Sequence, residues 1–140
     1  MKLLVVDDNQ AEQRLLLGMI EKAGLGDVLY TESLEQAYAL LGLDGKVGDS
    51  DIGVVLLDIT ALGDEGIAAC CRIKAEPCLE DVLVLVIAAQ SDTAVLPAVF
   101  AAGASDFIPR PCCQEELQAR GRMAVDLIQT EVVVLGAGPG

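Results

Sequence analysis

Short apolar runs alternate with longer amphipathic stretches along the chain. The short runs predict strands, and the stretches with an apolar residue at every third or fourth position predict helices. The predicted strands are Lys2–Val6, Val28–Thr31, Gly53–Leu57, Val82–Ile87 and Asp106–Ile108. The predicted helices are Ala11–Lys22, Leu34–Leu41, Ile67–Lys74, Ala94–Ala102 and Glu115–Ile128. The pattern is therefore a strand followed by a helix, repeated five times.

Two of the predicted strands are built on continuous apolar runs. Val54–Leu57 and Val82–Ile87 contain no polar residue. Strands of this kind are covered on both faces, which is typical of a parallel sheet between two layers of helices. Because crossover connections between parallel strands are right-handed, the sequence predicts a doubly wound α/β domain.

Acidic residues follow two of the predicted strands. Asp7 and Asp8 come directly after Val6, and Asp58 comes directly after Leu57. In a doubly wound sheet the ligand site lies outside the carboxyl ends of the strands, so we expect these three carboxylates to converge. Carboxylates packed together raise one another's pKa, a cost that a bound cation offsets. A site of oxygen ligands favours Mg²⁺, above all where a phosphoryl group joins the ligands.

The same residues also have purely structural interpretations. Asp7 and Asp8 could cap the helix that follows them, since acidic side chains stabilise the free amides and the dipole of a helix N-terminus. Asp58 could be a turn residue at the end of a strand, although a carboxylate beside a buried apolar run is costly without a purpose. Arg110, which lies between two prolines after the last strand, could be an ordinary surface cation.

The composition narrows the chemistry that these residues can perform. The 140 residues include 22 acidic and 9 basic side chains, which gives a formal net charge of −13, and 53% of them are hydrophobic. This hydrophobic fraction supports a folded core in a single domain. The negative charge argues against direct binding of nucleic acid or of an anionic membrane surface. The chain has no histidine, which excludes Ser-His-Asp and Cys-His catalytic groups and histidine-ligated metals.

The cysteines and the N-terminus predict a reducing, cytoplasmic environment. The five cysteines include two adjacent pairs and no Cys-x-x-Cys spacing, which fits neither a zinc site nor a disulfide framework. We interpret them as small, mostly buried residues in a reducing compartment, with a redox-sensing pair as the alternative. The apolar start is too short for a signal peptide, and the chain has no run of about 18 apolar residues that could cross a membrane.

Three motifs stand at the ends of predicted strands. They are VVDD (Val5–Asp8), LLDI (Leu56–Ile59) with Gly63 and Gly66 after it, and AAGASDFIPRP (Ala101–Pro111). With these motifs in this order, the chain from Lys2 to about Ile128 resembles the receiver domain of response regulators in two-component signalling. The resemblance implies a flavodoxin-like (βα)5 fold with a five-stranded parallel sheet in the order 2-1-3-4-5.

The resemblance also implies roles for individual residues. Asp58 matches the phosphoacceptor, the nucleophile that takes a phosphoryl group from a phosphohistidine of a partner kinase. Asp7 and Asp8 match the acidic pair that holds Mg²⁺ together with Asp58, and Thr60 would add its backbone carbonyl to the metal ligands. In such a site Mg²⁺ neutralises the phosphoryl oxygens and holds the reacting groups in line.

Partners follow from the same resemblance. It implies a sensor histidine kinase or a phosphotransfer protein as the phosphodonor, and an output domain or protein as the target. It also implies a receiver that is self-phosphorylating at most and is not an enzyme. The signal would pass through the face formed by the fourth helix (Ala94–Ala102), the fifth strand (Asp106–Ile108) and the fifth helix (Glu115–Ile128). That face is also a candidate homodimer interface.

The chain departs from the family pattern at several positions. Ala88 stands where the family has a threonine or serine that bonds the phosphoryl group, and Arg110 replaces the family's lysine. Phe107 matches the switch aromatic residue but has no hydroxyl group, and Leu62 replaces a proline common after the phosphoacceptor. Two hypotheses therefore stand: a phosphorylatable receiver, or a degenerate receiver that acts as a protein-interaction module without phosphorylation.

The last residues suggest a separate segment. We assign residues 1–128 to the receiver domain and residues 129–140 to a C-terminal tail or linker. Val132–Leu135 predicts a short strand that runs into the glycine-rich Gly136–Gly140. Such a pair could open a dinucleotide-binding domain in a longer protein. The third glycine of that fingerprint and the following helix are missing, so these residues alone predict no cofactor site.

Overall fold

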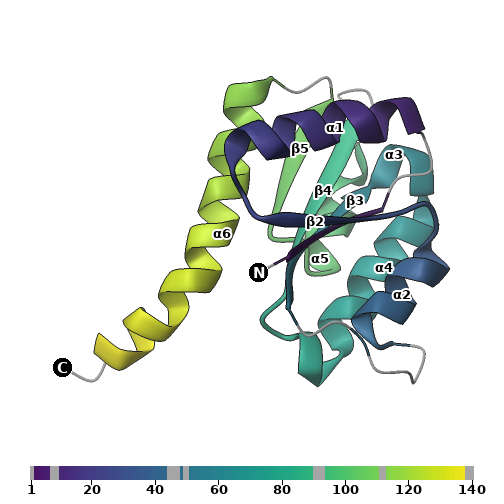
Figure 1. Ribbon diagram of the computed structural model, residues 1–140. Coiled ribbons are helices and arrows are strands. Elements are labelled where there is room, and N and C mark those ends of the chain that lie inside the picture. Colours follow the sequence, from purple (N-terminus) through teal and green to yellow (C-terminus); the bar gives the residue numbers. More distant parts are fainter. Residues whose placement is uncertain are drawn as a thin grey trace.

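The computed structural model describes residues 2–6, 10–43, 48, 51–89, 94–110 and 113–137. Its strands are β1 (Lys2–Val6), β2 (Asp27–Thr31), β3 (Ile52–Asp58), β4 (Leu83–Ala89) and β5 (Asp106–Arg110). Its helices are α1 (Gln10–Ala23), α2 (Leu34–Leu41), α3 (Ile59–Leu62), α4 (Asp64–Ala75), α5 (Leu96–Ala101) and α6 (Gln114–Ala137), with a 3₁₀ turn at Pro77–Leu79. The strands form one sheet with helices on both sides (Figure 1).

The five strands are parallel and lie in the order β2-β1-β3-β4-β5. This is the doubly wound, flavodoxin-like α/β fold that the sequence predicts, so both the fold class and the strand order are confirmed. In the central strand β3, Leu57 pairs with Val6 of β1 and Asp58 pairs with Ile87 of β4. The carboxyl ends of β1, β3 and β4 therefore meet at one edge of the sheet.

Both faces of the sheet are buried by apolar side chains. α2, α4 and α5 cover one face, where Val86 of β4 and Val99 of α5 belong to the same core cluster. α1 and α6 cover the other face, where Leu56 of β3 packs in a second cluster with Ile20 of α1 and Leu117 of α6. The two-sided burial of β3 and β4 accounts for their continuously apolar sequences.

α6 extends further than the predicted helix Glu115–Ile128. It continues to Ala137, so the predicted strand Val132–Leu135 is wrong. A strand needs a hydrogen-bonded neighbour, whereas a helix satisfies its backbone groups internally, and Figure 1 shows the end of α6 pointing away from the sheet. The predicted boundary at residue 128 falls within α6, and a linker over residues 129–140 stays a prediction. Despite the length of α6, no helix in the described part of the chain is both long and apolar enough to cross a membrane.

Two further differences lie at the ends of strands. The sequence does not predict α3, which begins directly after Asp58. β5 continues through Pro109 to Arg110, beyond the predicted end at Ile108. Proline has no N–H to donate, and β5 tolerates it because β5 is an edge strand that pairs only with β4.

Candidate functional site

The carboxyl edge of the sheet holds a buried carboxylate. Asp58, the last residue of β3, is 1% exposed, and among the described residues it is the only charged side chain that is buried. Burial removes water from a carboxylate, which is costly unless charged or polar groups replace that water. Asp58 is therefore the candidate reactive group at this edge.

The predicted acidic cluster is only partly described. β1 ends at Val6, which pairs with Leu57, so the chain leaves β1 close to Asp58. Asp7 and Asp8 lie outside the described residues, and within those residues no three acidic or cysteine side chains gather as metal ligands would. The convergence of Asp7, Asp8 and Asp58 therefore stays a prediction.

Arg110 lies at the same edge as Asp58. It is the last residue of β5, and it pairs with Ala89 at the end of β4. Its side chain lies outside the described part of the structure. The strand register thus puts a cationic residue at the carboxyl edge of the sheet, and the role of its guanidinium stays a prediction.

Thr60 links the end of β3 to the end of β4. The chain enters α3 directly after Asp58, and this puts the exposed Thr60 on the first turn of α3. Its Oγ1 accepts a hydrogen bond from the backbone N–H of Ala89, with an N···O distance of 2.8 Å. Sequence reasoning named Thr60 only for its backbone carbonyl and missed this side-chain contact. A hydroxyl group two positions after the end of a strand is the signal that could have indicated it.

Ala88 and Phe107 lie on the face of the sheet that α5 covers. Ala88 is 1% exposed and pairs with Pro109, while Val86, two residues earlier on the same face, pairs with Phe107. Phe107 is half-buried and packs against the core cluster on that face. At residue 88, a buried methyl group therefore stands where the family resemblance of the sequence implies a hydroxyl group.

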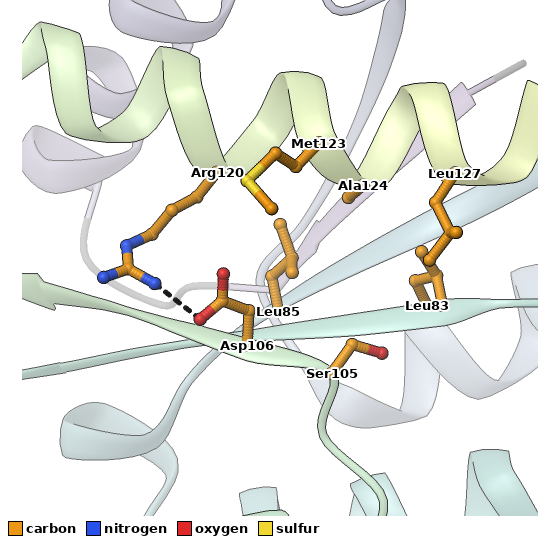
Figure 2. Close-up of a pocket in the computed structure, with 8 residues that line it drawn as sticks. All are labelled: Leu83, Leu85, Ser105, Asp106, Arg120, Met123, Ala124 and Leu127. Carbon is orange, nitrogen blue, oxygen red and sulfur yellow. Dashed lines mark hydrogen bonds and ion pairs between the residues drawn. The ribbon is translucent and has the colours of Figure 1, made fainter.

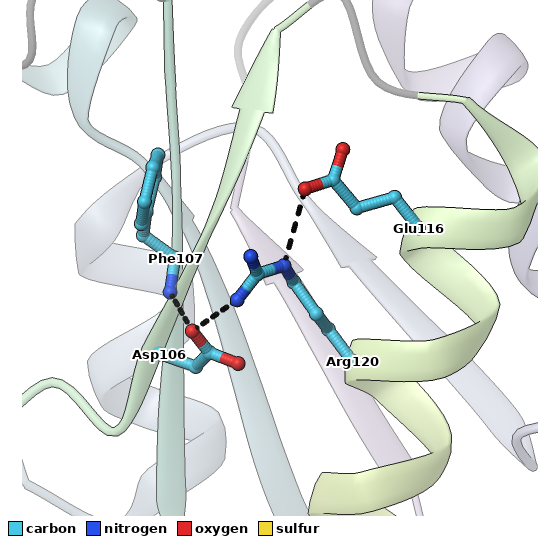
Figure 3. Close-up of polar contacts among 4 residues, drawn as sticks. All are labelled: Asp106, Phe107, Glu116 and Arg120. Carbon is cyan, nitrogen blue, oxygen red and sulfur yellow. Dashed lines mark hydrogen bonds and ion pairs between the residues drawn. The ribbon is translucent and has the colours of Figure 1, made fainter.

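A polar network beside the backbone of Phe107 joins β5 to α6 (Figure 3). Oδ1 of Asp106 accepts hydrogen bonds from the N–H of Phe107 at 2.8 Å and from Nη1 of Arg120 at 2.6 Å, and Nε of Arg120 lies 3.3 Å from Oε1 of Glu116. The Arg120 guanidinium also lies 5.7 Å from the centre of the Phe107 ring. Burial alone would lower the pKa of Arg120, but its bonds to Asp106 and Glu116 outweigh burial and raise that pKa. Sequence reasoning missed Asp106, Glu116 and Arg120, because their spacing does not indicate which strand α6 contacts.

A groove runs between α6 and the starts of β4 and β5, with a volume of about 180 Å³ (Figure 2). Met123 and Leu127 of α6, which are 68% and 58% exposed, form part of its wall. Leu83 and Asp106, the first residues of β4 and β5, also line it. The groove therefore lies toward the amino ends of the strands, away from Asp58.

The prediction that the cysteines are mostly buried is wrong for those that the structure describes. Cys70 of α4 is buried, its Sγ lies 3.6 Å from the Ala102 carbonyl oxygen, and burial raises its pKa to about 11. Cys71, Cys78 and Cys113 are exposed, and all four of these thiols are free. Adjacent residues on a helix point in directions about 100° apart, so Cys70 and Cys71 cannot share one environment.

Comparisons with known sequences identify the family. A sequence model of the response regulator receiver domain matches residues 3–122. The transcriptional regulatory protein YvrH of Bacillus subtilis is 30% identical over 120 residues, which cover 86% of this chain and 47% of that protein. A chemotaxis protein CheY homolog of Campylobacter jejuni is 26% identical over 120 residues, which cover 86% of this chain and 88% of that protein. The chain therefore belongs to the response regulator receiver domain family.

The fold is also shared with solved receiver domains. One of them is the receiver domain of the sensor histidine kinase PA1611 from Pseudomonas aeruginosa, which has a magnesium ion coordinated in its active site cleft. It matches with a TM-score of 0.70 and 21% sequence identity, over 89% of this chain and 97% of that one. At this identity the likeness concerns the fold. The chain spans the length of such single receiver domains but less than half of YvrH.

Proposed function

We propose that this chain is a phosphorylatable receiver whose Asp58 accepts a phosphoryl group from a partner histidine kinase or phosphotransfer protein. One observation carries the proposal: Asp58 is 1% exposed at the carboxyl end of the central strand, where doubly wound sheets bind their ligands. Membership of the receiver family supports the same role. That this chain has a partner kinase and a target protein is likewise part of what we propose.

The proposed reaction moves a phosphoryl group between two nucleophiles. A carboxylate oxygen of Asp58 attacks the phosphorus of the partner's phosphohistidine, and an O–P bond forms as the P–N bond breaks. The electron pair of the broken bond stays on the imidazole nitrogen of the partner. This chain leaves the reaction carrying the phosphoryl group, so we propose that it is a receiver and not an enzyme that acts on other molecules.

Mg²⁺ is the cation that we propose for the site. Asp58 supplies a buried carboxylate, and Asp7 and Asp8 follow directly on the strand paired with β3, so the donors are the hard oxygens that Mg²⁺ prefers. The proposed ligands are Asp7, Asp8, Asp58 and the backbone carbonyl of Thr60. When bound, the ion would offset the negative charge that the phosphoryl oxygens bring to the edge of the sheet.

We propose that the face formed by α5, β5 and α6 engages an output domain or a partner protein. Among the described residues, the exposed large apolar side chains are Phe100 of α5 and Met123 and Leu127 of α6, all on the two helices of this face. The hydrogen bond from Arg120 to Asp106 connects α6 to β5 on the same face. A second copy of the chain is an alternative partner for this face. The net charge of −13 favours protein partners over nucleic acid.

Intact-mass spectrometry after incubation with acetyl phosphate and Mg²⁺ tests the proposal. The expected result is a mass gain of one phosphoryl group in the native protein. The gain should be absent from Asp58→Asn and from a sample without Mg²⁺. A native protein that stays unmodified, while a reactive reference receiver in the same buffer gains mass, would contradict the proposal.

A receiver that works without phosphorylation is the second candidate. The observation that favours it is Ala88, a buried methyl group at the end of β4 where the family has a hydroxyl group. Such a module would keep the fold and bind its partner equally well with and without acetyl phosphate. The same mass measurement separates the two candidates, because only the first requires a modified Asp58.

A further inference from the structure

We propose that Thr60 is a positioning residue whose hydroxyl group holds the carboxyl end of β4 in place beside Asp58. The contact that carries this proposal is the hydrogen bond from the Ala89 N–H to Thr60 Oγ1, 2.8 Å long. It joins two segments 29 residues apart in the sequence. The functional consequence rests on the proposed role of Asp58 as the phosphoacceptor, whereas the contact itself does not.

The register of the sheet explains why the acceptor for the Ala89 N–H lies outside the sheet. Along a parallel strand, the amide groups of successive residues turn alternately to the two neighbouring strands. Val84 of β4 turns to the β5 side, where its carbonyl accepts from the N–H of Ser105. Five residues further on, Ala89 therefore turns its N–H toward β3. β3 has already ended there, because its last residue, Asp58, pairs with residue 87.

Thr60 supplies the acceptor that β3 no longer offers. The chain turns into α3 at Ile59, and the Thr60 hydroxyl stands where a continuing strand would present a carbonyl oxygen. Ala88 adds nothing to this connection, since its methyl group can neither donate nor accept a hydrogen bond. The side chain of Thr60, two residues after Asp58, thus holds the end of β4 through a hydrogen bond.

Through this hydrogen bond, the position of the end of β4 depends on the backbone segment that follows Asp58. Loss of the Thr60 hydroxyl would let the end of β4 separate from α3 without disturbing the interior of the sheet. Because phosphoryl transfer depends on the alignment of the reacting groups, a looser edge would slow the phosphorylation of Asp58.

Two substitutions at Thr60 and one control test the proposal. Thr60→Val removes the hydroxyl but keeps the branched shape, and Thr60→Ser keeps the hydroxyl. Thr31→Val is the matched control, because Thr31 also bonds a backbone group in the same sheet, with its Oγ1 donating to the Val5 carbonyl oxygen at 3.2 Å. Amide hydrogen exchange is measured by NMR in the unphosphorylated proteins, and phosphorylation by acetyl phosphate is followed by intact mass.

We expect the Ala89 amide of Thr60→Val to exchange about two- to tenfold faster than in the native protein, the range that loss of one hydrogen bond gives. The Ala89 amide of Thr60→Ser and of Thr31→Val should keep the native rate. Unchanged exchange at Ala89 in Thr60→Val, or an equal acceleration of the amides inside β3, would overturn the proposal.

The phosphorylation rates test the functional consequence. We expect slower modification of Asp58 in Thr60→Val, with the native rate restored in Thr60→Ser. A native rate in Thr60→Val would overturn the link between this contact and Asp58. If the native protein itself is not phosphorylated, the proposed function fails, and the exchange of the Ala89 amide still decides whether Thr60 holds β4.

Discussion

At the scale of single residues, Ala88 is the residue that bears most directly on the proposed phosphorylation of Asp58. Its methyl group is 1% exposed at the end of β4, on the face of the sheet covered by α5. A phosphoryl group on Asp58 would therefore find no hydroxyl donor from residue 88. Under the proposed function, the phosphorylated state lacks one hydrogen bond to a charged oxygen.

We expect Ala88→Ser to change the two states of the protein in opposite directions. A buried hydroxyl without a partner lowers the free energy of unfolding of the unphosphorylated protein by about 1–3 kcal/mol. In the phosphorylated protein, a hydrogen bond from this hydroxyl to the charged phosphoryl group stabilises the folded state by about 1.5–3 kcal/mol. Urea unfolding with and without acetyl phosphate measures both changes. Equal destabilisation in the two conditions would show that residue 88 does not reach the phosphoryl group.

Cys70 makes the stability of the protein depend on alkaline pH. Burial raises the pKa of its thiol from 9.0 to about 11, so between these values the folded chain keeps a proton that the unfolded chain releases. Its contribution to stability is complete below pH 9 and is lost as the pH rises toward 11. We expect the free energy of unfolding of the native protein to fall in this window by on the order of 2 kcal/mol more than that of Cys70→Ala. If urea unfolding shows the same fall of the free energy of unfolding with pH in both proteins, the Cys70 thiol is not its cause.

At the scale of elements, the contact between β5 and α6 depends on Arg120. The side chains of Arg120 and Asp106 are 32% and 31% exposed, and they meet at 2.6 Å next to the half-buried Phe107. Glu116 adds a second ion pair one turn earlier on α6. This partly exposed network stabilises the face that we propose for partner binding.

The expected strength of the pair follows from its exposure. A double-mutant cycle of Asp106→Asn and Arg120→Ala should give a coupling energy of about 0.2–1 kcal/mol, the range for ion pairs open to water. The coupling should weaken at high salt because salt screens exposed charges. Arg14→Ala, on the exposed side of α1, controls for the loss of one positive charge. A coupling energy of zero at low salt would show that the ion pair between Asp106 and Arg120 does not stabilise this face.

The elements also mark what the sequence can and cannot predict. β3 and β4 are predictable because their continuous apolar runs alternate with amphipathic stretches, the order expected for strands that helices bury on both faces. The run Val132–Leu135 has the composition of a strand but lies in a helix, because strand formation depends on a neighbour that the local sequence does not specify. The hydrogen bond between Thr60 and Ala89 depends on where β3 ends relative to β4, and this register is a property of the assembled sheet.

At the scale of the whole molecule, the fold and the candidate site are predictable to different degrees. The five strand and helix pairs specify the doubly wound sheet, and the sheet then places Asp58 and the backbone of Arg110 at one edge. The positions of Asp7 and Asp8 relative to Asp58 lie outside the described residues and remain predicted from strand order alone. Under the proposed function, phosphorylation at this edge takes place at one residue, Asp58.

Locating the modified residue distinguishes phosphorylation of Asp58 from modification of another carboxylate. Borohydride reduces an aspartyl phosphate to homoserine, so a native sample treated with acetyl phosphate and Mg²⁺ can be reduced, digested and sequenced by tandem mass spectrometry. We expect homoserine at position 58, and none at that position without Mg²⁺. Homoserine at another carboxylate, or an intact Asp58 beside a modified reference receiver in the same tube, would contradict it.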